Sequence, residues 1–379
     1  MKEAKGEEAF EIYFSRGRMN VLKSILEGKI PLSKELAEFV YQCSECGSCY
    51  EVCHKSQNEN IVFNTSKWID HVEVWNALRK DLVEEGCAPL DRHADLIEKM
   101  NNDTTKNPYG EEKSKKFEWA TEFPNIKEKG ELVFFAGCTM PLRQRDTLKN
   151  MMKILQVAGK EIAISTDEWC CGSIGLRIGD EQSVLNTIKH NIEVLKEMGA
   201  KEVFTACAGC YRTMKIDYPA LLGEQLPFEV KHITEVLADL LNNNEIPFKS
   251  TEEVPIKVTY HDPCHLGRHM ELYEIPRNVI AKIPGIRLIE MKRNRENAWC
   301  CGAGGGVKSQ FPDLALKIAA QRIEEAIETD ADILLTSCPF CVGNLRDALI
   351  QMKGESSQKI KVLDIIDFIA SNLTFKDRR

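Results

Sequence analysis

The chain lacks any long apolar run. None of its apolar stretches approaches the roughly 18–20 residues that a helix needs to cross a bilayer. The N-terminal segment MKEAKGEEAFEIYF is charged and has no apolar centre of the kind found in secretion signals. We therefore expect a cytoplasmic protein with no transmembrane segment of its own and with reduced thiols. Docking to a membrane subunit at the cytoplasmic face stays open.

Positive charge and nucleotide-binding motifs are also scarce. A formal net charge of −8 and a pI of about 5.7 argue against a nucleic-acid surface, which needs a clustered basic excess. No Gly-x-Gly-x-x-Gly follows a predicted strand, and GAGGGV at 302–307 is better explained as the loop after Cys301. Any hydride or flavin chemistry is therefore expected on another chain.

Cysteine, by contrast, is abundant: there are 15, and all but Cys87 fall into three motifs. The first motif is the run Cys43-x2-Cys46-x2-Cys49-x3-Cys53, which bacterial ferredoxins use to bind a [4Fe–4S] cluster. A zinc knuckle is the alternative, but zinc motifs need a second, distant pair of cysteines. In two-cluster ferredoxins the fourth cysteine binds the other cluster, so the fourth ligand here stays open between Cys53, which we prefer, and Cys87.

The second and third motifs are copies of one pattern. Each contains a single cysteine, an adjacent pair followed by glycine, and a Cys-x2-Cys pair, and the copies are offset by about 130 residues, which indicates an internal duplication. The cysteines of the first copy are Cys138, Cys170, Cys171, Cys207 and Cys210, and those of the second are Cys264, Cys300, Cys301, Cys338 and Cys341.

The pattern of apolar residues predicts an α/β fold. Residues 1–100 have helical periodicity and form a ferredoxin-like helical domain in this interpretation, and the polar residues 101–129 are predicted to be a solvated linker. Short β-like runs such as ELVFFAG, EIAIS and KEVFTAC then alternate with helices. This alternation predicts two duplicated α/β domains with parallel sheets, over residues 130–250 and 251–379.

The predicted strands bring the cysteines of each copy together. Cys138, Cys207, Cys264 and Cys338 each end a predicted strand, and the carboxyl ends of parallel strands are where α/β sheets bind ligands. We therefore expect five thiolates to converge in each domain. Gly172 and Gly302 let the backbone approach closely and offer amide donors.

Five thiolates exceed the four corners of an ordinary cubane cluster. A distorted iron–sulfur cluster with a bridging cysteine sulfur fits this surplus, whereas zinc would leave one thiol idle in both copies. A strained disulfide between adjacent cysteines is the other alternative. His261 and His265 flank Cys264 and are candidate proton donors, with helix capping or a core hydrogen bond as the alternative for each.

These residues resemble the CCG-domain family, specifically the B/D-type subunit of heterodisulfide reductase. The resemblance runs from Ser15 to the C-terminus through SRGRMNVLKSILEG, the Cys43–Cys53 run, HDPCHLGR, CCGAGGG and CPFC. It implies one cubane [4Fe–4S] cluster on the run and a noncubane [4Fe–4S] cluster on the five cysteines of each copy. The D-type subunit has two ferredoxin-type runs and this chain has one, so the route of electron entry stays open.

Two redox hypotheses follow. In the first, electrons pass from the cubane cluster to the noncubane pair, which cleaves a small-molecule disulfide. In the second, the chain only transfers electrons within a flavin-dependent lactate, glycolate or glycerol-3-phosphate dehydrogenase or a sulfur-metabolism complex. Both imply redox partner subunits: a flavoprotein, a ferredoxin-like protein or a membrane cytochrome or quinone-linked subunit. A zinc-binding interaction module is the non-redox alternative.

Overall fold

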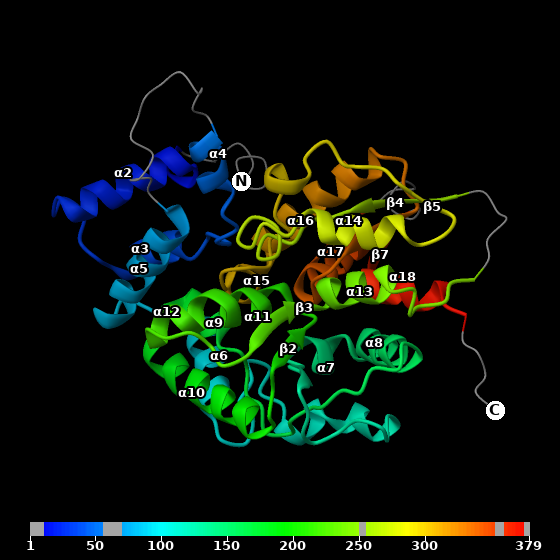
Figure 1. The fold of residues 1–379 in the computed structure, drawn as a ribbon. Helices are drawn as coiled ribbons and strands as arrows, with labels where there is room; N and C mark the ends of the chain where they lie inside the picture. The colour runs from blue at the N-terminus through cyan, green and yellow to red at the C-terminus, as the bar shows by residue number, and fades with distance from the viewer. Residues whose placement is uncertain (1–10, 56–69, 250–254, 353–359, 375–379) are drawn as a thin grey trace.

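The computed structural model describes residues 11–55, 70–249, 255–352 and 360–374, with the side chains of residues 11 and 53–55 excepted. Figure 1 shows a helical N-terminal part in blue beside two α/β layers, the green first repeat and the yellow-to-orange second repeat. We use these two terms for residues 130–250 and 251–379. Among the described residues, no helix is both long and apolar enough to cross a membrane.

The N-terminal part consists of short helices packed around one apolar core. Ser33 begins α3 as its N-cap, since its side chain accepts a hydrogen bond from the Leu36 amide. The Trp75 indole donates to the Val40 carbonyl oxygen over 2.9 Å, which joins α3 to α5. The elements are η2 (Glu11–Tyr13), α2 (Ser15–Leu26), α3 (Lys34–Val40), α4 (Ser48–Lys55), α5 (His71–Glu84) and α6 (Asp91–Asn101).

Residues 101–129, for which the sequence predicts a solvated linker, are instead packed against the first repeat. They contain two short helices, η4 (Lys113–Lys116) and η5 (Glu118–Glu122). Trp119 is buried among core residues of the first repeat, and Lys116 is fully buried. The prediction of a solvated segment is wrong because the polar composition conceals an apolar anchor at Trp119 and a lysine with a buried ionic partner.

The first repeat is built on a parallel sheet of three strands in the order β1-β2-β3. The predicted strand over 161–165 contributes only isolated bridges at Ala163. Its strands are β1 (Leu132–Phe134), β2 (Glu202–Thr205) and β3 (Glu229–His232). Its helices are α7 (Thr139–Arg143), α8 (Arg145–Val157), α9 (Ser173–Ile178), α10 (Glu181–Glu197), α11 (Ala208–Arg212), η6 (Thr213–Asp217), α12 (Tyr218–Leu222) and α13 (Ile233–Asn242).

The second repeat has a parallel sheet of four strands in the order β5-β4-β6-β7. Parallel sheets flanked by helices in both repeats confirm the α/β prediction. The strands are β4 (Ile256–Tyr260), β5 (Ile286–Leu288), β6 (Ile333–Thr336) and β7 (Lys361–Asp364). The helices are α14 (Glu274–Ala281), η7 (Arg295–Asn297), α15 (Val307–Gln310), α16 (Pro312–Ile327), α17 (Pro339–Gln351) and α18 (Ile365–Asn372).

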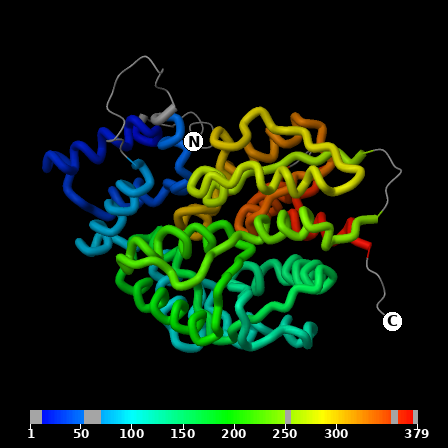
Figure 2. Tube along the Cα trace, in the orientation of Figure 1, coloured from blue at the N-terminus to red at the C-terminus, as the bar shows by residue number. Residues whose placement is uncertain are grey.

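The two repeats exchange contacts through their last helices. Helix α13, which ends the first repeat, packs against α14 of the second, and α18, which ends the second, packs against α8 of the first (Figure 2). Asp367 on α18 accepts hydrogen bonds from Thr147 over 2.8 Å and from Asn150 over 3.0 Å. One apolar core therefore contains side chains of both repeats, and the repeats hold each other in a fixed orientation.

This shared core makes a single unfolding transition the expected outcome. Phe134 on β1 is fully buried and packs against Phe204 with 5.1 Å between ring centroids. We predict that Phe134→Ala lowers the stability of the whole chain by about 3–5 kcal/mol, measured by anaerobic urea unfolding. The control Ile350→Ala, at a side chain that is 82% exposed, should change little. Two separate transitions, of which only one shifts, would contradict a shared core.

Candidate metal centre

The carboxyl ends of four strands deliver the first and fourth cysteines of each motif, as the sequence predicts. Cys138 follows β1, and Cys207 follows β2 and caps α11. Cys264 follows β4, and Cys338 follows β6 and caps α17. All four side chains therefore lie at the ligand-binding edge of a parallel sheet.

The five cysteines of the first repeat form one buried group. Cys138 lies within hydrogen-bonding reach of Cys170, Cys171 of Cys210, and Cys210 of Cys207. Donation from Cys138 to Cys170 raises the pKa of Cys138 and lowers that of Cys170. Thiols crowded in this way cannot all ionise unless a cation joins them, which is the property of a metal-binding group.

The second repeat reproduces this arrangement. Cys264 lies within hydrogen-bonding reach of Cys300, Cys301 of Cys341, and Cys341 of Cys338. The predicted amide donor is observed at Gly302, whose backbone N–H donates to the Cys300 sulfur over 3.2 Å.

Two equivalent asparagines hold the backbone of the adjacent cysteine pairs. Asn191 donates to the Cys170 carbonyl oxygen over 3.0 Å, and Asn344 donates to the Cys301 carbonyl oxygen over 2.6 Å. Both asparagines are fully buried. Sequence reasoning missed them, although the positions of both on helices beside a cysteine motif are readable in the repeat.

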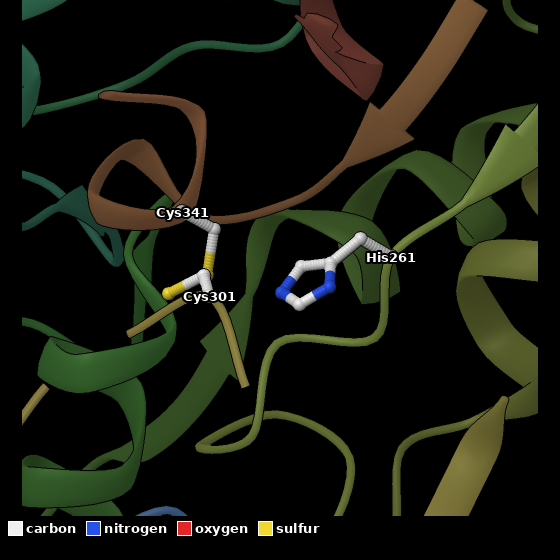
Figure 3. A group of neighbouring side chains, drawn as sticks. All are labelled: His261, Cys301 and Cys341. Carbon is white, nitrogen blue, oxygen red and sulfur yellow. The ribbon is translucent and has the colours of Figure 1, made fainter. Parts of the chain in front are cut away.

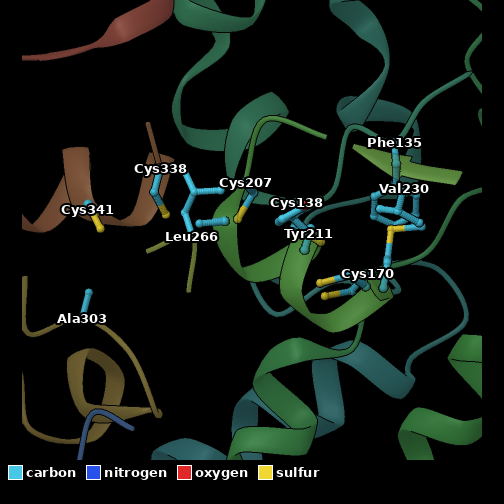
Figure 4. Close-up of a cluster of buried hydrophobic side chains, with 14 of the residues drawn as sticks. Phe135, Cys138, Cys170, Cys207, Tyr211, Val230, Leu266, Ala303, Cys338 and Cys341 are labelled. Carbon is cyan, nitrogen blue, oxygen red and sulfur yellow. The ribbon is translucent and has the colours of Figure 1, made fainter. Parts of the chain in front are cut away.

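The two cysteine groups meet between the repeats. Cys207 and Cys338 are within hydrogen-bonding reach, and Figure 4 shows them extending toward one another from the two repeats. Both groups line one cavity of about 560 Å³, a volume typical of small-molecule sites. The site is therefore a pair of thiol groups that face a common space.

The N-terminal cysteine run lies against the second group. Cys46 is within hydrogen-bonding reach of Cys300, and Arg268 donates to the Cys46 carbonyl oxygen over 2.7 Å. Burial, with Cys46 and Cys43 nearby, raises the pKa of Cys49 to about 12. The run therefore forms a third crowded thiol group, directly beside the second repeat.

A glycine run in the second repeat makes this approach possible. A Cβ on Gly304 would lie 2.7 Å from the Ser44 carbonyl oxygen, and one on Gly305 would lie 2.5 Å from the Cys43 carbonyl oxygen. The prediction that this run belongs to the Cys301 loop agrees with its position. Its additional role, close contact with the N-terminal cysteine loop, has no signal in the sequence.

A buried ion pair fastens the same junction. Arg79 lies 2.5 Å from the Glu45 carboxylate, and both side chains are fully buried. The guanidinium also donates to the Cys43 carbonyl oxygen over 2.7 Å and to the Gly305 carbonyl oxygen over 3.0 Å. Because each of these carbonyls belongs to a cysteine-bearing loop, Arg79 ties the N-terminal run to the second repeat.

Lys116, from the stretch predicted to be a linker, supports the first group. Its ammonium lies 3.0 Å from Glu168, which accepts hydrogen bonds from the Ala136 and Gly137 amides just before Cys138. The cation therefore lies behind the loop that carries Cys138, close to Cys170.

Two predicted positions in the N-terminal run remain predictions. The side chain of Cys53 lies outside the described residues. The Cys87 thiol lies 3.8 Å from the Glu85 carbonyl oxygen, at the end of α5. Cys53 therefore stays our preferred fourth ligand and Cys87 the alternative.

The two candidate histidines occupy different positions. His265 lines the cavity, and burial, with His269 beside it, lowers its pKa well below 6.5. His261 is fully buried next to Cys301 and Cys341, and burial, together with Arg322, lowers its pKa to about 3 (Figure 3). Both rings are therefore neutral at pH 7.

The donor sets fit iron–sulfur clusters. Buried, mutually contacting thiols are the ligands that such clusters require, and five in each group exceed the four that tetrahedral zinc takes. The backbone donor at Gly302 supplies the kind of hydrogen bond that surrounds cluster sulfurs.

Comparison with known proteins agrees with this geometry. The family model described as a cysteine-rich domain (CCG) matches residues 132–215 and 258–346. The D-type subunit of dihydromethanophenazine:CoB–CoM heterodisulfide reductase from Methanosarcina mazei is 40% identical over 354 residues, which cover 91% of this chain and 81% of that protein. The subunit of fumarate reductase (CoM/CoB) designated B, from Methanothermobacter marburgensis, is 32% identical over 333 residues, which cover 88% of this chain and 61% of that one.

A solved structure supports the fold alone. A hypothetical protein from Helicobacter pylori matches 83% of this chain and 60% of its own length with a TM-score of 0.52 and 11% identity.

The duplicated domain and its thiol groups define an iron–sulfur oxidoreductase subunit of the cysteine-rich CCG class. Within that class, the chain belongs to the family of the D-type subunit of heterodisulfide reductase. This confirms the resemblance read from the motifs.

The glycine contact gives a testable prediction. Gly305→Ala forces a Cβ to within 2.5 Å of the Cys43 carbonyl oxygen at a positive φ of 61°, whereas Gly28→Ala, at φ 67°, meets nothing within 4 Å. We expect Gly305→Ala to cost about 1–3 kcal/mol more than Gly28→Ala in anaerobic urea unfolding, since overpacking adds to the shared backbone strain. Equal losses in the two variants would show that this junction is loosely packed.

Proposed function

We propose that this chain reduces a small-molecule heterodisulfide of the coenzyme M–coenzyme B type. The observation that carries the proposal is that both five-cysteine groups line one cavity and meet at Cys207 and Cys338. Reduction of one disulfide consumes two electrons and two protons and yields two thiols, so a paired site suits the stoichiometry. The relative named as a heterodisulfide reductase of CoB and CoM supports the same substrate class.

We infer three clusters. The five cysteines of each repeat would hold a noncubane [4Fe–4S] cluster, and Cys43, Cys46, Cys49 and Cys53 would hold a [4Fe–4S] cubane. When bound, the clusters supply the two electrons and the Lewis acidity at which the disulfide sulfurs are reduced.

The cavity wall favours an anionic substrate. Arg143, Arg177 and Lys308 line it together with a single carboxylate residue, Asp347. Part of this charge is already paired, because Lys308 contacts Asp347 and Arg177 lies 2.5 Å from Asp217. Arg143 is stacked on Tyr109, with its guanidinium carbon 4.1 Å from the ring centroid, at the wall of the cavity. We infer that the substrate carries acidic groups beside its disulfide.

His265 is the histidine that the substrate would meet. It lines the cavity, and its neutral ring offers a departing thiolate an N–H hydrogen bond rather than a stored proton. We propose that His265 orients the leaving sulfur and that protons reach it from solvent in the cavity.

Electron delivery is proposed at the N-terminal part. Its cysteine run contacts the second group through Cys46 and Cys300. A redox partner subunit would therefore dock near α4 and the Cys43–Cys49 loop. A flavoprotein, a ferredoxin-like protein or a membrane cytochrome or quinone-linked subunit would each supply electrons there.

Electron transfer without disulfide chemistry is less favoured. A relay needs closely spaced cofactors but no substrate cavity between them, and this chain has a cavity lined by nine of the ten repeat cysteines. The similarity to the D-type subunit of heterodisulfide reductase points the same way.

The test is anaerobic single turnover. Protein reduced under anaerobic conditions and mixed with the coenzyme M–coenzyme B heterodisulfide should release two free thiols per disulfide, measured by thiol titration. Electron transfer to a dye acceptor without any thiol release from the disulfide would leave only the relay function.

Iron content tests the cofactor assignment separately. We expect about twelve irons per chain, four for each cluster, falling to about eight in Cys210→Ser or Cys341→Ser. Cys87→Ser is the matched control and should keep all of them, because its thiol contacts a backbone carbonyl. About four irons in the unaltered chain would contradict the assignment for both repeats.

A further inference from the structure

The two cysteine groups differ at one equivalent position. The His261 amide donates to the Leu335 carbonyl oxygen over 2.8 Å, and the Phe135 amide donates to the Phe204 carbonyl oxygen over 2.9 Å. Each residue therefore follows the first strand of its repeat and lies three residues before the first cysteine. Both side chains are fully buried. Where the second repeat has an imidazole, the first has a phenyl ring.

A buried arginine fixes the tautomer of His261. Arg322 Nε donates to His261 Nδ1 over 3.1 Å, and a guanidinium is a donor only. Glu325, 2.7 Å away, and the Arg293 carbonyl oxygen at 2.8 Å hold the guanidinium in place. Because Nδ1 must accept, the proton of the neutral ring is on Nε2.

This Nε2–H is directed at the cysteines. Figure 3 shows the ring nitrogen remote from Cβ facing Cys301 and Cys341. The ligand atoms of the three residues lie within 4.8 Å of one another. Among the described residues Nε2 has no hydrogen-bond partner, although it is buried. A buried donor without a partner is costly, so the site is built for an acceptor that arrives with its metal.

The same arginine argues against His261 as a metal ligand. Binding iron through Nε2 would require its lone pair, and the proton would have to move to Nδ1, where it would face the Arg322 donor. A thiolate or sulfide sulfur, in contrast, accepts the existing Nε2–H without rearrangement.

We propose that His261 is a positioning residue that donates a fixed hydrogen bond to the sulfurs of the second cysteine group and makes its cluster easier to reduce than that of the first. The inference rests on the proposed cluster in each repeat. A donor to sulfur stabilises the added negative charge of the reduced state, and Phe135 offers none. The two sites are therefore unequal, and the site beside the N-terminal run holds an electron more readily.

The experiment is a potentiometric titration of the iron-loaded protein, followed by EPR. His261→Phe copies the first repeat, and His261→Gln keeps an N–H donor. We expect His261→Phe to weaken the one-electron reduction of one cluster by about tenfold, about 59 mV, and to leave the other unchanged. His261→Gln should restore most of the shift, and His190→Phe, at a histidine stacked on Trp169, should cause none.

The outcomes separate this inference from the proposed function. Unchanged potentials in His261→Phe at about twelve irons would overturn the inference and leave the clusters standing. If His261→Phe loses iron, His261→Gln carries the measurement, and loss of iron from the second site in both variants would identify a ligand instead of a donor. Pulsed EPR on protein labelled with ¹⁵N-histidine gives a second readout: we expect an exchangeable proton coupling with weak nitrogen coupling, and strong nitrogen coupling would contradict it.

Discussion

Buried thiolates repel one another, and a group of five can carry charge only where cations join it. Both repeats bury five cysteines in mutual contact, and the N-terminal run adds a third such group. The cation shared by thiolates lowers the cost of their burial, so metal binding and folding are coupled here. The loops around the cysteines follow from this constraint: glycines admit close backbone approach, and buried asparagines and an amide donor fix the cysteine backbones and sulfurs.

The exchange of terminal helices sets how the groups face each other. With α13 on α14 and α18 on α8, the repeats cannot rotate apart without opening a common apolar core. The thiol groups therefore meet at Cys207 and Cys338 with a cavity between them. The N-terminal part is fastened to this pair by Arg79 and the Gly304–Gly306 loop, on the side of the second repeat. Duplication thus produces a symmetrical pair, and the added helical part and His261 make it asymmetric.

The local features of the site were predictable from the sequence, and the long-range ones were not. Cysteines such as Cys138 and Cys338 end apolar runs, so the parallel-sheet rule places them at one edge. Contacts such as that of Cys46 with Cys300 join segments far apart in the chain, and no periodicity encodes them. Lys116 was misassigned because a short polar stretch normally indicates solvent, whereas its charge is neutralised by Glu168 in the interior.

The most direct test of the paired site is an anaerobic crystal structure with anomalous scattering from iron. We predict two iron groups, each held by the five cysteines of one repeat, facing one another across the cavity at Cys207 and Cys338, with a third group beside Cys46. Iron confined to the N-terminal run, or two repeat sites that do not open to a common cavity, would contradict the paired arrangement on which the proposed disulfide chemistry depends.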